Sequence, residues 1–252
     1  MSVQIRVPIL YYHRVAEGIP LKQGVSPMVF QSQVDYLRRK RYQSIGFEDL
    51  AEALQQGHPL PSRPIIISFD DGYLDTFTTA YPILKKAGFT ATTFVVSGFI
   101  GEESHWEGSR ENVSRLMTRE NILAMSKDGF PFGGHTRTHK NLLSISRQEA
   151  EDEVGSGKRD LEELLQKPVY SFAYPYGTFN EQIITIVKNL GFRVARTVHT
   201  DNTHNRQDLF KLRCVKVNGL TPAWKFKYYL TRFYHWDILW QEWKKARRSH
   251  GR

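Results

Sequence analysis

Two short segments, far apart in the chain, carry side chains whose types and spacing could do chemistry together. In the first, Asp70 and Asp71 stand side by side between an apolar run and a glycine. In the second, His135 and His139 are separated by three residues. One carboxylate and two imidazoles make a metal-binding triad that leaves coordination positions open for water and substrate. The second carboxylate remains free to act as a base, so the combination points to metal-assisted hydrolysis.

Each motif also has a purely structural interpretation. An Asp-Asp-Gly sequence behind a strand can be a turn, in which aspartate caps the next helix and glycine adopts a positive φ. The His-x-x-x-His spacing places both rings on one side of a helical turn, where they either form a polar face or share a cation. Because both motifs directly follow expected strands, we interpret them together as one metal site.

The composition is that of an ordinary globular chain with an excess of positive charge. Its 252 residues are 40% hydrophobic and 24% charged, and the formal net charge is +9. This is enough apolar material for a core, and α/β barrels often have this length. The one cysteine, Cys214, excludes a disulfide framework and a thiolate-rich metal site. The charge is compatible with an anionic partner but does not select one.

Strand-like and helix-like segments alternate along the chain, which indicates a parallel α/β arrangement. The expected strands are 8–12, 65–69, 90–96, 130–134, 169–173, 193–198 and 212–217. The expected helices are 27–39, 47–56, 74–86, 119–127, 147–166 and 180–189. About seven strand–helix units favour a (β/α) barrel over a small open sheet.

The polar side chains are placed so that a barrel would bring them together. In such barrels the catalytic groups lie at the carboxyl ends of the strands. Asp70 and Asp71 follow one expected strand, His135 follows another, and His13 and residues 174–177 follow two more. We therefore expect these groups to converge on one face of the barrel.

With these motifs in place, the sequence resembles the polysaccharide deacetylases of the NodB-like group, carbohydrate esterase family 4. Residues 68–72 match the family's first motif, residues 135–139 its second and residues 172–177 part of its third. The resemblance covers roughly residues 8–217. It implies a distorted (β/α) barrel of the NodB type that removes N-acetyl groups from an amino sugar and releases acetate.

The resemblance also implies roles for the motif residues. Asp70 would be the general base, and Asp71, His135 and His139 would hold a divalent metal ion. The backbone N–H of Tyr176 would stabilise the oxyanion. Zn²⁺ is the expected ion because an Asp-His-His set with open positions suits it, and Co²⁺ or Ni²⁺ are the alternatives. The same ligands suit an iron(II) oxygenase, but such an enzyme needs no base beside its metal.

The sequence departs from the common pattern of the family at two places. Ala173 stands where many members carry an arginine, and residues 197–199 lack the leucine of a late Leu-x-His motif. A subgroup resembling the poly-N-acetylglucosamine deacetylases has its acid histidine near the N-terminus instead, and the Tyr-Tyr-His-Arg-Val segment around His13 is similar to it. We expect His13, as imidazolium, to protonate the leaving amine, with His199 and His204 as alternatives. A separate acid and base predict a bell-shaped pH–rate profile.

Several aromatic residues near the motifs suit a carbohydrate substrate. We expect Tyr176, Pro175 and Trp106 to contact the sugar, whereas Tyr11 and Tyr174 alternate with their neighbours as packed barrel residues do. The substrate is then an N-acetylated glycan or glycolipid. Two other functions stay open at this point: hydrolysis of another linear or cyclic amide at the same site, and catalytically silent glycan binding.

Residues 221–252 are predicted to form a basic, aromatic helical extension behind a deacetylase barrel of residues 1–220. Its stripe at helical spacing consists of Tyr229, Phe233, Trp236, Trp240 and Trp243. Such a stripe either packs on the barrel or lies in a membrane interface between basic residues. Nucleic-acid binding is disfavoured because no recognition motif accompanies the charge. Neither a signal peptide nor an apolar run of ~20 residues is visible, so we expect a cytoplasmic location or peripheral membrane contact.

Overall fold

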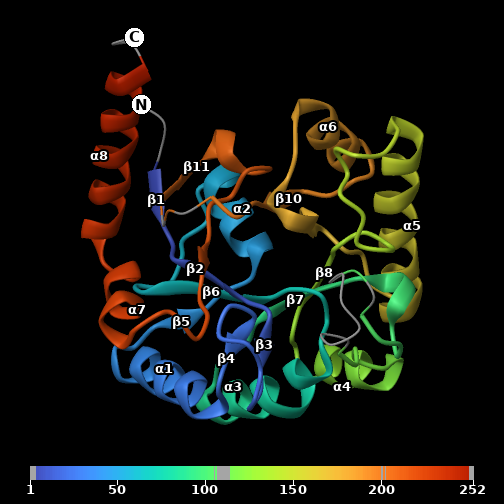
Figure 1. The fold of residues 1–252 in the computed structure, drawn as a ribbon, viewed down its shortest axis with the longest axis horizontal. Helices are drawn as coiled ribbons and strands as arrows, with labels where there is room; N and C mark the ends of the chain where they lie inside the picture. The colour runs from blue at the N-terminus through green and yellow to red at the C-terminus, as the bar shows by residue number, and fades with distance from the viewer. Residues whose placement is uncertain (1–3, 105, 107–113, 200, 202, 250–252) are drawn as a thin grey trace.

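The computed structural model describes the chain except for residues 1–3, 105, 107–113, 200, 202 and 250–252. Its centre is a curled sheet of parallel strands in the order β10-β9-β8-β7-β6-β2-β12, with β5 paired beside β6 (Figure 1). In chain order these strands are β2 (Ile9–Tyr12), β5 (Gln43–Ser44), β6 (Pro64–Phe69), β7 (Thr92–Val95), β8 (Phe132–Gly134), β9 (Ser171–Ala173), β10 (Val194–Arg196) and β12 (Val215–Lys216). The sheet forms a half-barrel, which confirms the expected distorted barrel of about seven parallel strands.

The helices surround this sheet, with α5 and α8 at opposite sides of the molecule (Figure 1). Their bounds are α1 (Pro27–Arg39), α2 (Phe47–Gln56), α3 (Tyr81–Ala87), α4 (Arg119–Lys127), α5 (Arg147–Leu165), α6 (Glu181–Asn189), α7 (Ala223–Tyr229) and α8 (Arg232–Ser249). Two small strand pairs lie outside the main sheet: β1 (Gln4–Arg6) with β11 (Thr203–Asn205), and β3 (Arg14–Val15) with β4 (Gly24–Val25).

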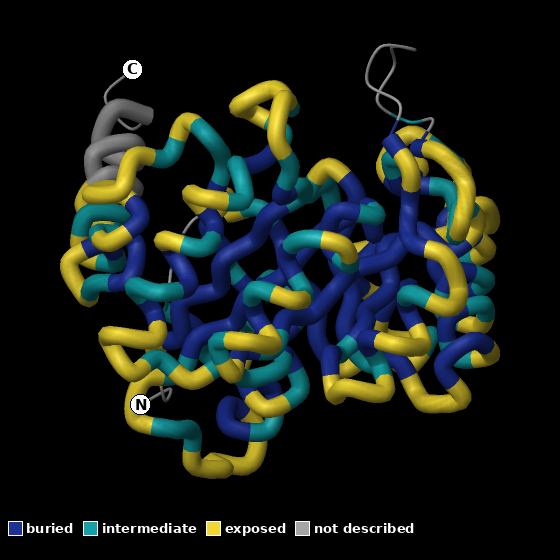
Figure 2. Tube along the Cα trace, turned by 90° about the horizontal axis from the view of Figure 1, so that it is seen from below, coloured by how far each residue is buried: buried dark blue, intermediate teal, exposed yellow. Residues whose placement is uncertain are grey.

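The central strand β6 shows why a continuous β-branched run forms here. Ile65 and Ile67 belong to the large apolar cluster shared with α1, α3 and α5, whereas Ile66 belongs to a second cluster shared with α2. Alternate side chains of a strand point to opposite faces, so a strand covered on both faces must be apolar throughout. Figure 2 shows the result, with a buried centre and exposed residues on the surrounding helices and loops.

Local sequence signals set several helix ends. Ser26 caps α1 ahead of a proline at the first helical position, and Thr118 and Ser146 form capping boxes at α4 and α5. The expected helix 74–86 is instead a π-helical segment, Thr76–Ala80, followed by α3. The backbone N–H of Tyr81 bonds to the carbonyl of Thr76, and Pro82 has no N–H with which to continue the ordinary ladder.

The aromatic extension forms two helices, α7 and α8, not the single helix expected. Tyr229 is buried at the end of α7, but Phe233, Trp236, Trp240 and Trp243 of α8 are exposed, so most of the stripe does not pack on the barrel. The division into a barrel of 1–220 and an extension stays a prediction. Among the residues that are described, no helix is both long and apolar enough to cross a bilayer.

Candidate active site

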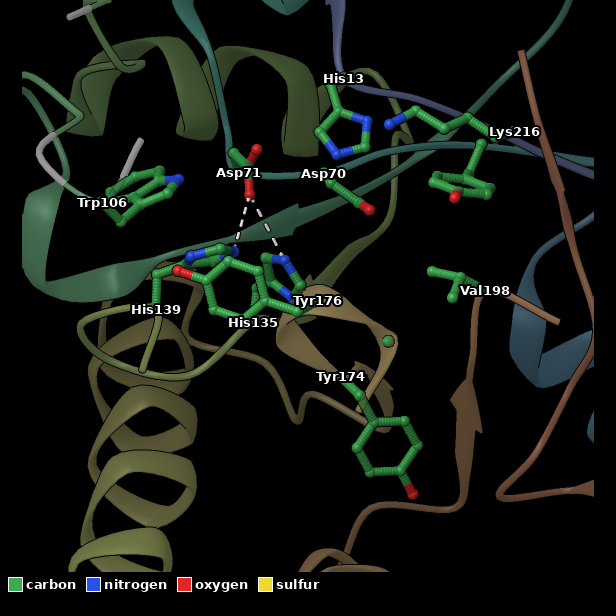
Figure 3. Close-up of a pocket in the computed structure, with 12 residues that line it drawn as sticks. His13, Asp70, Asp71, Trp106, His135, His139, Tyr174, Tyr176, Val198 and Lys216 are labelled. Carbon is green, nitrogen blue, oxygen red and sulfur yellow. Dashed lines mark ion pairs between the residues drawn. The ribbon is translucent and has the colours of Figure 1, made fainter. Parts of the chain in front are cut away.

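A cavity of about 310 Å³ opens at the carboxyl ends of the central strands (Figure 3). It is lined by Tyr11, His13, Asp70, Asp71, Trp106, His135, His139, Tyr174, Tyr176, Gly177, Val198 and Lys216. The barrel therefore brings the residues of both motifs into one place. Of the residues expected to act in the site, only Pro175 is absent from this lining; it is buried at the start of the turn that carries Tyr176.

Asp71, His135 and His139 have the spacing of metal ligands. The Oδ1 atom of Asp71 lies 3.4 Å from Nε2 of His135 and 3.3 Å from Nε2 of His139. Ligand atoms about 2.0–2.1 Å from a tetrahedral Zn²⁺ are about 3.3–3.4 Å from one another. All three side chains are buried, so the cluster is a preformed set of donors rather than a surface coincidence.

The electrostatics of the cluster also fit a cation. The Oδ1 atom of Asp71 is buried and has no hydrogen-bond partner. A buried, ionised oxygen without a hydrogen bond is costly unless a positive charge faces it. A divalent cation between these three side chains meets that requirement.

The ring of His135 is oriented for this role by the backbone of β9. Its Nδ1–H donates to the carbonyl oxygen of Ala173 at 2.7 Å, since a carbonyl can only accept. This hydrogen bond fixes the proton on Nδ1 and leaves the lone pair of Nε2 directed at Asp71. Ala173 thus contributes its backbone to the site.

His135 and His139 do not share a helical turn, so that expectation is wrong. They lie in the loop between β8 and α5, where Thr136 and His139 adopt left-handed conformations with φ of 64° and 60°. The loop therefore has no helical path between the two histidines, and its own backbone conformation brings their rings together. Asp71 (φ 71°) and Tyr176 (φ 58°) are left-handed as well. Such conformations cost energy in non-glycine residues and are typical of functional sites.

Helix α5 holds the histidine loop in this conformation. The carboxylate of Glu153, which is buried, accepts hydrogen bonds from the backbone N–H of Thr138 at 2.8 Å and from its hydroxyl at 2.5 Å. The backbone carbonyl of Glu153 accepts a third from the N–H of Arg137 at 3.0 Å. Gly157, one turn further on, lets the helix approach closely, because a Cβ there would lie 2.8 Å from the backbone carbon of Thr136.

Arg196, a residue that was not predicted from the sequence, holds Asp70 apart from the cluster of Asp71, His135 and His139. The two form an ion pair in which both side chains are almost completely buried. Arg196 lies on β10 directly beside Ala173 of β9 in the parallel register. Position 173, where many members of the family carry an arginine, is an alanine here. Arg196, at the neighbouring position of the next strand, provides an arginine instead. The signal available in the sequence was a charged residue, Arg196, in the middle of the expected strand 193–198.

His13 lies in the cavity beside the two aspartates (Figure 3). Burial lowers its pKa to about 4; Asp71 opposes this shift, whereas Lys216, Arg196 and His135 add to it. His13 is therefore neutral near pH 7 in the metal-free protein, not the imidazolium that we expected. A buried imidazole accepts a proton readily only when negative charge develops near it.

The alternative acid histidines lie elsewhere. His204 is fully buried on β11, where Nε2–H donates to the Val7 carbonyl at 3.0 Å. His199 stacks near Phe179 at 5.7 Å between ring centres. Neither lines the cavity, so His13 is the histidine, besides the two expected ligands, that the structure places there.

Aromatic rings flank the cluster of Asp71, His135 and His139 on the open side of the cavity. The rings of Trp106 and Tyr176 lie 4.8 Å and 4.7 Å from that of His139. Tyr176 is 54% exposed, so its face remains accessible to a ligand. Tyr11 and Tyr174 are buried, as the alternation along their strands predicts, and form the inner wall.

Comparison with known proteins identifies the family. The sequence profile of the polysaccharide deacetylases matches residues 57–195, which is more than half of the chain. The protein belongs to the polysaccharide deacetylase family. This confirms the resemblance drawn from the two motifs.

Individual relatives are similar over most of the chain. YxkH of Bacillus subtilis (strain 168), described as a polysaccharide deacetylase, is 26% identical over 213 residues, which are 84% of this chain and 72% of that protein. The poly-β-1,6-N-acetyl-D-glucosamine N-deacetylase of Staphylococcus aureus (strain MRSA252) is 27% identical over 179 residues, or 68% of this chain and 59% of that protein. The chain thus spans a little over half the length of the staphylococcal relative.

Solved structures share the fold. The Streptococcus pyogenes deacetylase PplD in complex with acetate superposes with a TM-score of 0.80 and 22% identity, covering 91% of this chain and 100% of that one. IcaB from Ammonifex degensii gives 0.77 and 24%, covering 89% and 95%. The curled parallel sheet described above is therefore the fold of these deacetylases.

The close approach of α5 to the histidine loop predicts an effect of one methyl group on metal binding. In Gly157→Ala the new Cβ meets backbone atoms that cannot rotate away, so the loop must shift and the ligands with it. We expect the affinity for Zn²⁺ to fall by about tenfold to a hundredfold, as with other changes to groups that orient ligands. Competition with a chromophoric chelator measures this.

Gly155→Ala is the matched control, since it makes the same change two residues earlier on the same helix. Its Cβ would meet side-chain ends of Leu190 and Arg159, which can move. It should keep the metal affinity and gain up to about 1 kcal/mol in stability from the better helix former. Equal metal affinity in Gly157→Ala and Gly155→Ala would contradict the positioning role of α5.

The ion pair of Asp70 predicts a change in pH dependence when Arg196 is neutralised. In Arg196→Gln the buried carboxylate loses its cation and holds a proton more tightly. We expect kcat to fall and the acid limb of its pH profile to move to higher pH, with Arg196→Lys restoring part of both. Unfolding in urea should show a loss of about 3–5 kcal/mol for the broken buried pair. An unshifted acid limb in a folded, metal-loaded Arg196→Gln protein would argue against this role.

Proposed function

We propose that this protein is a metal-dependent hydrolase that removes N-acetyl groups from an N-acetylated amino sugar in a polysaccharide and releases acetate. One observation carries the proposal: two adjacent carboxylates face different partners in one cavity. Asp71 faces two imidazoles at ligand spacing, and Asp70 faces Arg196. Membership of the polysaccharide deacetylase family supports the reaction, and the name of the staphylococcal relative supports an N-acetylglucosamine polymer as substrate.

The polar residues at the centre of the cavity have distinct parts in this reaction. Asp71, His135 and His139 would hold a Zn²⁺ ion, or Co²⁺ or Ni²⁺ in its place, which would polarise the acetyl carbonyl and lower the pKa of the attacking water. Asp70, oriented by Arg196, accepts the proton of that water. The backbone N–H of Tyr176, presented by a left-handed turn, donates to the oxyanion.

The leaving amine needs a proton before the carbon–nitrogen bond breaks. His13 is neutral in the resting site, and the negative charge of the oxyanion raises its affinity for a proton, which it takes up from solvent. His13 then delivers that proton to the nitrogen, and Asp70 returns the proton of the attacking water to solvent as acetate leaves. The rings of Trp106 and Tyr176 lie beside that of His139. From there they stack on the sugar rings and orient the acetamido group toward Asp70 and His13. The expected contact of Pro175 stays a prediction.

Arg196 argues against one of the two alternative functions, silent glycan binding, and leaves the other, hydrolysis of a different amide, to be tested. A catalytically silent glycan-binding protein was motivated by the missing arginine at position 173, and Arg196 fills that position from the adjacent strand. Hydrolysis of a different amide would use the same catalytic groups, so only a comparison of substrates distinguishes it from deacetylation. Acetate release should be compared on a β-1,6-linked N-acetylglucosamine oligomer, chito-oligosaccharides, a lipid-linked amino sugar and a cyclic ureide.

The two neighbouring aspartates allow a matched test of this proposal. Asp70→Asn removes the base and should lower acetate release by about 10²–10⁴-fold while the bound metal stays stoichiometric. Asp71→Asn, the same change one residue later, removes a ligand and should abolish both metal binding and turnover. A chelator should abolish acetate release by the unaltered protein, and added Zn²⁺ should restore that activity. Elemental analysis and acetate release measure the two properties. Undiminished turnover in Asp70→Asn, or turnover that survives complete chelation, would overturn the proposal.

The low pKa of His13 predicts the basic limb of the pH profile. If the transition state carries a proton on His13 that the free enzyme lacks, kcat/KM falls by about tenfold for each unit of pH above that pKa. We therefore expect kcat/KM to rise as the pH is lowered from 8 to 6, with metal content checked at each pH. His13→Asn should lower kcat/KM and remove this slope, whereas His199→Asn should keep it. A slope retained in His13→Asn would assign the acid elsewhere.

A further inference from the structure

A second cavity, of about 400 Å³, lies at the opposite ends of the strands from the active site, where β2 and β6 begin. It is lined by Arg6, Pro8, Tyr36, Lys40, Tyr42, Ser62, Arg63, Pro64, Lys227, Leu230, Thr231 and Arg232. Five of these residues are cationic and none is acidic. We call it the basic cavity.

The positive charge of the basic cavity is not neutralised by the described part of the protein. Lys40 and Lys227 lie over the ring of Tyr36 at 6.0 Å and 5.5 Å, and Arg63 lies over that of Tyr42 at 5.8 Å. No described carboxylate forms an ion pair with any of the five cations. The run Arg38-Arg39-Lys40-Arg41 at the end of α1 adds to the same region. Like charges gathered in this way raise the local concentration of anions.

An exposed aromatic face begins at the rim of this cavity. Arg232 lines the cavity and opens α8, and Trp236, Trp240 and Trp243 follow it at helical spacing. These tryptophans are 65%, 52% and 51% exposed. On α7, Trp224 is 68% exposed and precedes Lys227 of the cavity by one helical turn. Both helices therefore place tryptophan next to a cation of the basic cavity.

The other side of α8 is the one that attaches to the barrel. Tyr234 is buried against Tyr229, and Nδ1 of His235 lies 3.0 Å from the buried carboxylate of Asp201. The carbonyl of Leu230, between α7 and α8, accepts hydrogen bonds from Arg6 and Tyr42 at 3.0 Å and 3.2 Å. These contacts attach α7 and α8 to the barrel at the edge of the molecule where α1 also lies (Figure 1), and the tryptophans of both helices stay exposed.

We propose that the basic cavity and the exposed aromatic face of α7 and α8 (Trp224, Trp236, Trp240 and Trp243) together dock the protein on an anionic phospholipid bilayer. Lipid phosphates enter the basic cavity, and the indole rings insert at the boundary between headgroups and acyl chains, where tryptophan is favoured. Four of the five tryptophans of the chain, all except Trp106, lie on this surface. In this arrangement α7 and α8 lie on the membrane surface and do not cross the bilayer.

Charge argues for a bilayer over a second copy of the chain. Residues 221–252 hold eight Lys or Arg and two Asp or Glu, a net charge of +6 out of the +9 of the whole chain. Two such surfaces brought face to face would repel each other, whereas an anionic bilayer attracts the Lys and Arg residues near it. Nucleic acid shares the negative charge but offers no apolar layer for the tryptophans.

Docking in this orientation has a consequence for the substrate, which rests on the proposed function. The basic cavity and the active site lie at opposite ends of the same parallel strands. A bilayer bound at one end leaves the catalytic cavity open away from the lipid. The glycan that reaches it is then a polymer that extends from the membrane, not an amino sugar within the headgroup layer.

Vesicle binding tests the docking surface without reference to catalysis. The full chain is mixed with vesicles of phosphatidylcholine alone or with 25–30% phosphatidylglycerol (about the charge density of an anionic membrane), and sedimentation and tryptophan emission are recorded. We expect binding to the anionic vesicles only, a blue shift of the emission, and weaker binding at high salt. Equal binding to both vesicles, or to neither, would overturn the proposal. Failure here would leave acetate release untouched and so would not bear on the proposed function.

Matched variants locate the surface. Lys40→Glu with Lys227→Glu should weaken vesicle binding by at least tenfold, whereas Arg119→Glu with Lys127→Glu makes the same charge change on α4 and should weaken it far less. Trp236→Ala with Trp240→Ala should abolish the blue shift, and Leu123→Ala, also at an exposed apolar residue, should not. Circular dichroism checks that each variant folds.

Other occupants give distinct results. A stable dimer that is lost in the tryptophan variants, without vesicle binding, would assign the surface to a second copy. Binding of a DNA duplex with no affinity for anionic vesicles would assign it to nucleic acid. Saturation by inorganic phosphate alone, with no vesicle binding, would reduce it to a small-anion site. Each of these outcomes would overturn the proposal.

Discussion

The site depends on giving two adjacent carboxylates different partners. Asp70 and Asp71 leave the same strand at the same point, and in a sheltered cavity two unpaired carboxylates would repel each other strongly. The left-handed backbone at Asp71 turns its side chain toward the histidines, while Asp70 meets Arg196 on the far side. Each carboxylate therefore has a positive or metal-binding neighbour of its own. A ligand and a base can then coexist within two residues, which is what metal-assisted hydrolysis requires.

Maintaining this division strains the backbone, and the surrounding helices and strands absorb the strain. Left-handed residues occur at Asp71, Thr136, His139 and Tyr176, and each is costly in isolation. Helix α5 offsets part of that cost, since Glu153 bonds both backbone and side chain of the histidine loop. The positions of the ligands are thus set by a long, regular helix that contributes no ligand itself.

The sequence predicted the parts of the fold and site that depend on local patterns. Buried β-branched strands, helix caps and the positions of the motifs behind strands all depend on neighbouring residues, so the half-barrel and the convergence of its polar groups could be read directly. The helical turn expected at His135 and His139 was wrong because the spacing alone does not show that Thr136 is left-handed. Arg196 was missed because its partner, Asp70, is distant in the chain and only strand register brings them together. Register and burial are tertiary properties, and so is the low pKa of His13.

The two ends of a parallel sheet are chemically independent, and in this protein each end carries its own cavity. The carboxyl ends collect the two aspartates and the three histidines of the candidate site, because side chains and loops from several strands meet there. The amino ends are free of that constraint, and here they carry cations and tyrosines instead. The hydrogen bonds from Arg6 and Tyr42 to Leu230 join the aromatic helices to the strand starts, so their orientation relative to the barrel is fixed. Any surface that binds these helices therefore also determines the direction in which the catalytic cavity opens.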